Sequence, residues 1–424
     1  MARACFVNVM IMFSYLNLIT NIPSYYADEQ NYLFSHSLFN PGFPRFGSFQ
    51  DYDDQNQHRP FIQSHPIKED HDDHHHRHHH DHDHDHDDHH HHHDHDDADE
   101  QLHPLEENEK QEKNPKNTLL VEGFYRRTCP NAEQIVANQV AEIVKTNPTA
   151  IAALIRLHFH DCFVGGCDAS ILLDTLEFEE KVEKLSPTNG QLLKGADLID
   201  DIKAKLEEEC PGIVSCADTI AFAAIESMTL GGLPPQPKLG GRRDSLSSRA
   251  AEAEDNLPFP NWSMDQMLNL FKKKGFNAED MVALNGAHSV GSAHCNIFNE
   301  RLYNYSNTGR PDPTLDLVAV DELKKICKPP GSTNVRDNPT VNFDETPTVI
   351  DNLLYKNLVE KRKALLETDQ AMANDKRTAL FVKRMAEDPN LFPVKFGEVM
   401  SRMGSLGVLT GKQGEVRTTC RSTT

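Results

Sequence analysis

Residues 154–170 read LIRLHFHDCFVGGCDAS and combine an arginine, two histidines, two acids and two cysteines in one short segment. The apolar spacing predicts a helix over residues 151–160, in which Arg156 and His160 share a face because they are four positions apart. His158 lies about 200° around that helix from His160, so the two imidazoles are not expected to bind one ion together. A cation beside an imidazole keeps the ring neutral and able to accept a proton. Taken alone, this segment is more typical of a core histidine beside a solvated arginine.

The second half of the segment offers several oxygen ligands. Asp161, Asp168 and Ser170 follow one another closely, and the glycines between them free backbone carbonyls. A bridge between Cys162 and Cys167 would hold this loop tight. Calcium prefers about six to eight oxygen ligands from carboxylates and carbonyls, so the loop is a candidate calcium site. An ordinary disulfide loop is the alternative.

A further histidine lies in the stretch Asn285-Gly-Ala-His288-Ser-Val-Gly, where small neighbours would let a bulky group approach. A neutral histidine at such a position is either a buried structural residue or an axial haem ligand. Asp369 could accept a hydrogen bond from Nδ1–H of His288, which would make the imidazole a stronger donor to iron.

The front of the chain differs in composition from the rest. The 424 residues carry a net charge of −22, and residues 1–117 hold 23 acidic and 8 basic side chains. This acidity argues against nucleic acid as a partner. Residues 28–117 are polar and poor in branched aliphatics, which predicts disorder. Residues 71–97, called the His/Asp tract below, hold 16 of the 24 histidines, from His71 onwards. The tract predicts loose binding of zinc, nickel or copper, with a low-complexity linker as the alternative.

The N-terminus and the cysteines both indicate secretion. Residues 1–27 begin with one arginine and an apolar run, as a signal peptide does, with cleavage expected near Ala27. An uncleaved membrane anchor is disfavoured because a span needs about 20 apolar residues. Eight of the nine cysteines follow residue 118, as expected of four disulfides in an oxidising compartment. Sequons at Asn261 and Asn304 are compatible with glycosylation.

From residue 118 the chain has a globular composition, and its apolar residues recur mostly at helical spacing. Alternating strand patterns are scarce. The helices expected on this basis span residues 131–146, 151–160, 197–210, 216–230, 264–275, 278–286, 351–361 and 391–404. Residues 118–424 are therefore predicted to form one mostly α-helical domain with long disulfide-bonded loops.

Five motifs of this domain, in this order, resemble the signatures of secreted plant haem peroxidases, the class III family. They are RLHFHDCFVGGCDAS (156–170), VSCADTIAFAA (214–224), LGGRRDS (239–245), DMVALNGAHSVG (280–291) and GSLGVLTG (404–411). The resemblance runs from about Leu119 to Cys420 and includes all eight family cysteines.

The resemblance implies an all-α haem peroxidase fold, in which two helical subdomains hold a buried haem b between them. It implies four disulfides, namely Cys129–Cys210, Cys162–Cys167, Cys216–Cys420 and Cys295–Cys327. It also implies two Ca²⁺ ions. By motif match, the distal ion takes Asp161, Val164, Gly166, Asp168 and Ser170. The proximal ion takes Ser289, Asp344, Thr346, Val349 and Asp351, although the chain is one residue shorter than the family pattern after Asp344.

The resemblance also assigns catalytic roles on the distal side of the haem. His160 is expected to act as general base and then general acid on hydrogen peroxide, while Arg156 stabilises the developing negative charge. Glu183 and Asn189 match a supporting pair in which the asparagine orients the distal histidine. Thr188 stands where the family usually has proline. Phe159 is expected beside the haem.

On the proximal side, His288 is expected to ligate the iron with Asp369 behind it. Pro258, in the sequence LPFP, matches a family position that contacts electron donors. The segment GGLPPQPKLGGRRD lacks the family's tryptophan and carries an extra residue, and Ile350 replaces a usual phenylalanine.

The function expected from the resemblance is the reduction of H₂O₂ to water with one-electron oxidation of small phenolic donors. Cell-wall cross-linking or lignification, peroxide removal and stress response are the roles that fit. A metal-binding or storage protein with an inactive peroxidase-like domain is the alternative. We expect a monomer secreted to the cell wall or apoplast, with no membrane association once processed. The vacuole is less favoured because RSTT after Cys420 does not resemble a sorting extension.

Overall fold

The helix α4 (Ala150–Phe163) lies between two hydrophobic cores and contributes to both. Its Leu154 and Leu157 belong to the first core, whereas Ile151 and Ile155 belong to the second. This is possible because apolar residues cover more than one face of the helix, so that ten of its residues are buried. The computed structural model describes residues 120–174, 181–189, 193–331 and 338–423. The predicted signal peptide, the extension over 28–117 and its His/Asp tract lie outside these residues.

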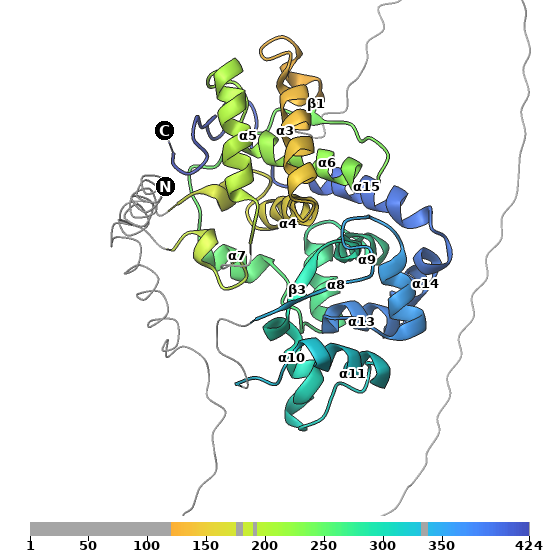
Figure 1. Cartoon of the computed structure of the whole chain (residues 1–424). Coiled ribbons are helices and arrows are strands. Elements are labelled where there is room, and N and C mark those ends of the chain that lie inside the picture. The colour runs from red at the N-terminus through yellow and green to blue at the C-terminus, as the bar shows by residue number, and fades with distance from the viewer. Residues whose placement is uncertain (1–119, 175–180, 190–192, 332–337, 424) are drawn as a thin grey trace, which may run out of the picture. The chain divides into compact units, whose positions relative to one another are not determined.

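The first core is formed by helices that come early in the chain. α4 packs mainly on α6 (Cys216–Leu230), and α3 (Ala132–Thr146) packs on α6 and on α5 (Ala196–Glu209). α6 begins at the N-cap Ser215, whose side chain accepts a hydrogen bond from the backbone N–H of Asp218. These helices occupy the upper part of Figure 1.

The second core is built from later helices, most of which lie below α4 in Figure 1, whereas α15 is seen above α4. They are α8 (Met264–Lys273), α9 (Ala278–Asn285), α12 (Leu353–Lys356), α13 (Glu367–Asn374), α14 (Ala379–Glu387) and α15 (Leu391–Met403). α9 packs on α15, and α15 also contacts α4. The predicted arrangement of two helical halves is confirmed.

A third, smaller cluster packs beside the second core. Its elements are the strands β3 (Ser292–His294) and β4 (Thr340–Asn342), which pair antiparallel, and the helices α10 (Cys295–Tyr303) and α11 (Leu317–Ile326). The other regular elements are β1 (Val121–Glu122), β2 (Leu239–Gly240), α7 (Ala250–Asn256) and the 3₁₀ turns η2 (Phe124–Arg126), η3 (Ser170–Leu172), η4 (Glu183–Leu185), η6 (Gly286–Ser289) and η7 (Tyr305–Asn307).

One expected helix differs from the structure. Residues 351–361 form the short helix α12 followed by a π-helical turn, η8 (Asn357–Lys361). At that change of winding, the Asn357 amide donates to the Glu345 carboxylate at 2.9 Å, and Arg362 then adopts φ 42°. Sequence periodicity carries no information on such a tertiary hydrogen bond.

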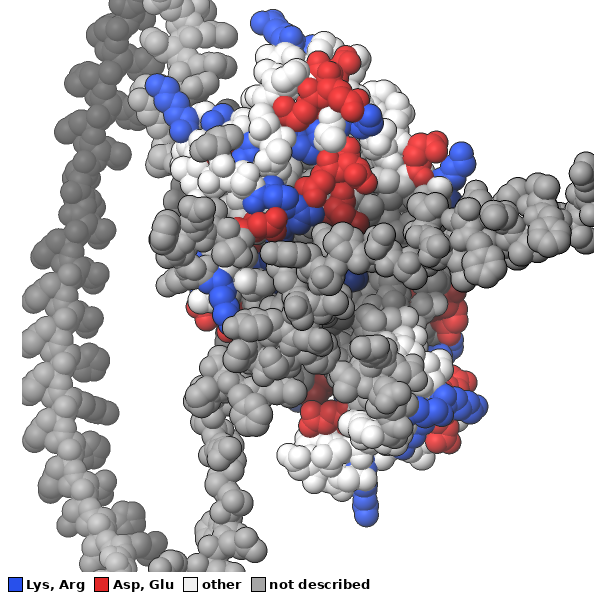
Figure 2. Space-filling model, turned by 60° about the vertical axis from the view of Figure 1, so that its left-hand side comes forward, with Lys and Arg blue, Asp and Glu red and all other residues white. Residues whose placement is uncertain are grey.

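The cysteines of the described residues form the four disulfides that the resemblance implies, Cys129–Cys210, Cys162–Cys167, Cys216–Cys420 and Cys295–Cys327. Among the described residues, no helix is both long and apolar enough to cross a membrane. On the face shown in Figure 2, acidic and basic side chains of these residues lie next to one another.

Candidate active site and calcium sites

The distal histidine is held between two polar partners. Arg156 Nε donates to His160 Nε2 at 3.1 Å, one helical turn away on α4. On the other side of the ring, His160 Nδ1 lies 2.6 Å from Asn189 Oδ1. Since the Asn189 oxygen only accepts and the Arg156 nitrogen only donates, these contacts assign the hydrogen to Nδ1 and a lone pair to Nε2. His160 is thus poised as a neutral base at Nε2.

Electrostatics favour the same neutral form. Burial, followed by the nearby Arg156 charge, lowers the pKa of His160 to about 3, against a smaller opposite effect of Asn189. Arg156 is accessible to solvent, yet it lies deep enough for burial to lower its pKa. Phe159, half-buried on the same helix, meets His160 edge to face with ring centroids 5.7 Å apart.

A separate loop positions Asn189. Its amide nitrogen donates to the carbonyl of Glu183 at 2.7 Å, and the Glu183 N–H donates to the Ser248 hydroxyl at 3.0 Å. Thr188 replaces the proline expected from the family, and its hydroxyl lies 2.8 Å from that of Ser186. A local hydrogen bond therefore accompanies the turn at this position.

His158 lies on another face of α4, as the helical spacing predicts. It is buried, its Nδ1 lies 3.6 Å from Cys162 Sγ, and its pKa is lowered to about 3 by burial and by Arg242. No ion could be shared by His158 and His160 from these opposite faces.

The second histidine site combines His288 with a buried carboxylate. His288 lies in the 3₁₀ turn η6, and its Nδ1 is 2.9 Å from Asp369 Oδ1 on α13. Asp369 is fully buried, while the His288 side chain is 30 % exposed. The bond fixes the hydrogen on Nδ1 and leaves Nε2 with a free lone pair.

Phe343 is a site residue that the motif reading missed. Its ring stacks on the His288 ring with centroids 4.5 Å apart and an interplanar angle of 6°. Phe343 follows β4 and directly precedes Asp344. A backbone hydrogen bond from the Phe343 N–H to the Gly291 carbonyl, at 3.2 Å, joins this segment to the one that follows His288. Its place next to a predicted calcium ligand was the available signal.

These residues fit a haem. The required protein ligand is an imidazole with a free nitrogen and a buried carboxylate behind it, and His288 with Asp369 is such a pair. A neutral base and an arginine, His160 and Arg156, lie on the other helical half.

The distal oxygen cluster has the character of an ion site. Asp161, Asp168 and Glu183 are all buried. Within the described part of the chain, no hydrogen-bond partner of ordinary geometry reaches either Asp161 oxygen, the Ser170 hydroxyl or Glu183 Oε2. Burial, then Asp168 and Glu183, raise the pKa of Asp161, and burial raises the pKa of Glu183 to about 8. Buried carboxylates this close are unfavourable unless a cation neutralises them.

The backbone of the same loop is tightly constrained. Gly166 has φ 145°, and a Cβ there would meet the Gly407 carbonyl oxygen at 2.5 Å, so only glycine fits. The carbonyl of Val164 accepts from Lys274 Nζ at 3.1 Å. A carbonyl has two lone pairs, which leaves one of them for an ion.

The C-terminal segment braces this loop. Arg417 is fully buried and donates to the Ala169 carbonyl at 2.8 Å, where Ala169 adopts φ 58°. The Asp174 N–H donates to the Arg421 carbonyl at 2.8 Å. Together with the Cys216–Cys420 disulfide, these bonds fasten the last residues of the chain over the distal loop.

Three of the predicted proximal ligands, Asp344, Thr346 and Asp351, lie together despite the shorter loop. The Thr346 hydroxyl lies 3.1 Å from Asp344 Oδ1 and 3.0 Å from Asp351 Oδ2. In the described residues, Asp344 Oδ2 and the buried Ser289 hydroxyl have no hydrogen-bond partner. Burial raises the pKa of Asp344 to about 6. Val349 is exposed, and its N–H donates to the Thr346 carbonyl at 2.9 Å.

Both oxygen clusters are rich in hydroxyls and carbonyls rather than in side chains typical of transition-metal sites. No group of three or more His, Cys, Asp or Glu with metal-site geometry occurs within the part of the chain that is described. This donor chemistry suits calcium.

Pro258 lies half-buried in the loop between α7 and α8. The carbonyl of Pro260 accepts from the Thr368 N–H at 3.1 Å, and Thr368 directly precedes Asp369. This bond ties the predicted donor-contact loop to the helix that supports His288.

Comparison with known proteins adds independent evidence. The family model "Peroxidase" matches residues 136–388. Peroxidase 37 of Arabidopsis thaliana is 44% identical over 310 residues, which cover 71% of this chain and 87% of that protein. Peroxidase C2 of Armoracia rusticana is 43% identical over 310 residues, with the same coverage of 71% and 87%. Peroxidase 5 of Vitis vinifera is 42% identical over 299 residues, covering 70% and 90%.

Proposed function

The chain belongs to the peroxidase family, as a secreted haem peroxidase of the plant class III type, and on this premise we propose that Arg156 and His160 activate hydrogen peroxide. The cofactors of the family are haem and calcium. When bound, the haem supplies the redox chemistry that reduces hydrogen peroxide and oxidises a donor one electron at a time. His288, with Asp369 behind it, would hold the haem iron, and Phe159 would lie against the haem.

His160 transfers the proton, and Arg156 stabilises the developing negative charge. Nε2 of His160 takes a proton from one oxygen of hydrogen peroxide and delivers it to the other, which leaves as water. Arg156, whose Nε lies 3.1 Å from that nitrogen, stabilises the negative charge that develops as the O–O bond breaks. Glu183 acts as a positioning residue, because its carbonyl holds the amide of Asn189.

The arrangement around His160 carries this proposal. Asn189 on one side and Arg156 on the other support one tautomer, with the base at Nε2. The purified secreted protein is expected to show a Soret band that changes on addition of H₂O₂. A protein without that band would contradict the function itself. The chain matches the peroxidase family and carries Arg156, His160 and His288, so the alternative of an inactive, metal-storing protein is not favoured.

Asn189→Asp is expected to move the acid limb of peroxide reduction to higher pH. The lowered pKa of His160, about 3, means that the neutral base is present above that pH and is lost as the pH falls through it. A carboxylate in place of Oδ1, 2.6 Å from Nδ1, would favour the protonated ring and raise this pKa. Stopped-flow rates of peroxide reduction as a function of pH give the pH at which activity falls on the acid side. The control is Asn256→Asp, outside the site, and an unmoved limb in Asn189→Asp would refute the role of Asn189.

Donor oxidation is proposed to take place next to Pro258. The half-buried ring lies on a loop whose Pro260 carbonyl accepts from the N–H of Thr368 on α13, and Thr368 is the neighbour of Asp369 in the chain. Small phenols would contact the exposed side of this ring. Cell-wall cross-linking, lignification and peroxide removal are the processes that such donors suggest.

Two calcium ions are proposed to occupy the oxygen clusters. The distal ion would take Asp161, Asp168 and Ser170 with the carbonyls of Val164 and Gly166. The proximal ion would take Ser289, Asp344, Thr346, Val349 and Asp351. The convergence of Thr346 on both aspartates supports the proximal assignment in spite of the missing residue.

The domain organisation is proposed from composition: a signal peptide over 1–27, an extension over 28–117 and the peroxidase domain over 118–424. We propose that the secreted enzyme acts as a monomer in the wall or apoplast rather than in the vacuole. The His/Asp tract would bind zinc, nickel or copper loosely, because imidazole is a good ligand for these ions.

Deletion of residues 71–97 is expected to remove the uptake of Zn²⁺ or Ni²⁺ by the tract without changing peroxide reduction, because the proposed catalytic residues lie in the folded domain. Isothermal titration calorimetry of the full-length and deleted proteins measures the uptake. A deletion of residues 30–56, of the same length but with one histidine, is the matched control. Identical isotherms for the full-length protein and the 71–97 deletion would refute a metal role for the tract.

A further inference from the structure

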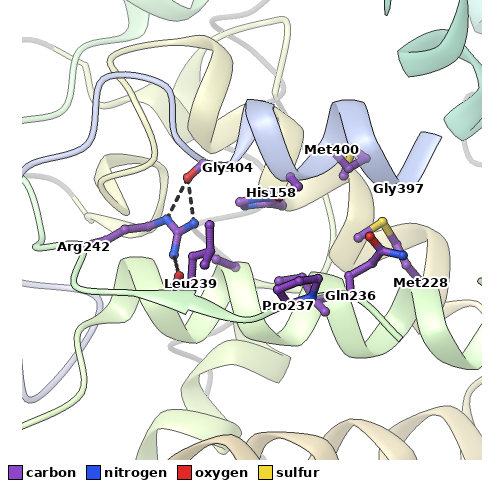
Figure 3. Close-up of a pocket in the computed structure, with 12 residues that line it drawn as sticks. His158, Met228, Gln236, Pro237, Leu239, Arg242, Gly397, Met400 and Gly404 are labelled. Atoms are coloured by element: carbon purple, nitrogen blue, oxygen red, sulfur yellow. Dashed lines mark hydrogen bonds between the residues drawn. The ribbon is translucent and has the colours of Figure 1, made fainter. Parts of the chain in front are cut away.

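A small cavity lies behind α4, on the side away from His160. It has a volume of about 20 Å³, is partly open to solvent, and is lined by residues of α4, α6, α15 and the segment around β2. Figure 3 shows His158 between Arg242 on one side and two methionines, Met228 and Met400, on the other. A water-sized guest needs roughly 10–15 Å³, so the cavity admits a molecule of the size of water or hydrogen peroxide.

The two methionines reach this cavity although they are buried as residues. Met228 on α6 is 2 % exposed and Met400 on α15 is 3 % exposed. Both line the cavity, near Gln236 in Figure 3. Their thioethers are soft nucleophiles that peroxide oxidises to the sulfoxide.

Other methionines of the described residues are equally shielded but have no such access. Met281, Met372 and Met403 are all fully buried in the second core, and none of them lines this cavity. The two groups of methionines are therefore equally buried. They differ in that only Met228 and Met400 line the cavity.

Gln236 closes one side of the cavity. It is half-buried, and its Nε2 donates to the Pro234 carbonyl at 3.0 Å. A Cβ on Gly397 of α15 would meet the Gln236 amide at 3.1 Å, so the amide packs directly on that helix. This segment lacks the tryptophan of the family pattern, and Gln236, which is partly exposed to solvent, lines the cavity.

We propose that Met228 and Met400 form a peroxide-oxidation site of this protein, reached through the cavity behind α4. The thioether sulfur attacks one oxygen of H₂O₂, the O–O bond breaks, and the other oxygen leaves as water after proton transfer. The sulfur loses two electrons and the peroxide gains them, so no other oxidant is needed. Hydrogen peroxide is the substrate of the enzyme and is therefore present whenever the enzyme works.

Oxidation at this place changes the support of the distal helix. A sulfoxide is polar, and it would enter a cavity whose walls are mainly apolar, between α6 and α15. Both helices contact α4, which carries His158 towards the cavity and His160 on another face. Loss of packing there would lower the stability of the helix that holds the catalytic base.

The test exposes the haem-loaded enzyme to H₂O₂ and follows each methionine by peptide mass spectrometry over time. Met228 and Met400 are expected to form sulfoxide several-fold faster than Met281, Met372 and Met403 in the same molecules. Equal rates at all five would overturn the proposal. Because peroxide is added directly, this result does not depend on which residues catalyse its reduction.

Variants of Gln236 distinguish oxidation by peroxide that enters the cavity from oxidation by radicals. Gln236→Trp is expected to slow oxidation of Met228 and Met400 several-fold, and Gln236→Ala to accelerate it, with Met281 unchanged in both. Oxidation by radicals spreading from the haem would be indifferent to residue 236, so unchanged rates in both variants count against the cavity. Gln236→Ala keeps the test decisive if the larger side chain impairs folding.

The double variant Met228→Leu/Met400→Leu is expected to retain its thermal midpoint after peroxide treatment, whereas the unsubstituted enzyme loses several degrees. Leucine conserves the volume of methionine and does not form a sulfoxide. Met281→Leu/Met372→Leu is the matched control and should lose as much as the unsubstituted enzyme. Equal losses in both double variants would overturn the consequence drawn for α4.

Discussion

Replacing His160 by alanine is expected to lower the rate of peroxide reduction by about 10²–10⁴-fold, the range of a lost general base. The expectation rests on the Nε2 lone pair, which the contacts with Arg156 and Asn189 assign to the neutral ring. Stopped-flow measurement of the reaction with H₂O₂ gives the rate without interference from the donor step. The haem spectrum before peroxide should persist, because His288 lies on the other half.

His294→Ala is the matched control for this experiment. His294 is a half-buried histidine outside the site, where its Nδ1 lies 2.9 Å from the Asn338 carbonyl. This variant should reduce peroxide at the normal rate. An undiminished rate in His160→Ala, with the protein folded and haem-loaded, would remove His160 from the mechanism.

Asp161→Asn is expected to reduce bound calcium from two ions to one per protein and to lower the thermal midpoint in calcium. Binding at 100 times the Kd stabilises the folded state by about 2.7 kcal/mol, and the variant loses this contribution. After chelation the order should reverse, because the variant lacks a buried carboxylate beside Asp168 and Glu183. Atomic emission gives the stoichiometry, and calorimetry gives the midpoints.

Asp265→Asn serves as the control, since Asp265 is exposed and pairs only with Arg377 at the surface among the described residues. It should keep both ions and the midpoint of the unsubstituted enzyme. A variant at Asp161 that still binds two calcium ions would contradict the distal assignment.

The sequence predicts the helices of this domain where one apolar face is continuous. α3, α5, α6, α8 and α15 lie within one or two residues of the expected ranges. It does not predict α7, α10, α11, α13 or α14, which span only seven to ten residues each and are too short to be stable without tertiary packing. The disulfide partners came from the family resemblance, because eight cysteines allow about 105 pairings.

Helical spacing predicts only the part of the candidate site whose residues lie close together in sequence, whereas the pairs His160–Asn189 and His288–Asp369 were expected from the motifs. The separation of Arg156 and His160 fixes their common face, and the same geometry separates His158 from them. Phe343 was missed because its contact with His288 joins segments that are far apart in the chain.

Arg417 and Cys420 hold the distal loop through a hydrogen bond and a disulfide, so this loop can be stabilised only late in biosynthesis. A ribosome delivers the N-terminal part first, so α4 and the aspartates Asp161 and Asp168 emerge long before the residues that fasten the distal loop. Cys420 is joined to Cys216 across a sequence separation of 204 residues. The loop is therefore completed only once Cys420 has followed Cys216 into a compartment that oxidises thiols. A nascent chain that stops before Arg417 would possess every proposed catalytic side chain and still lack this support of the distal loop.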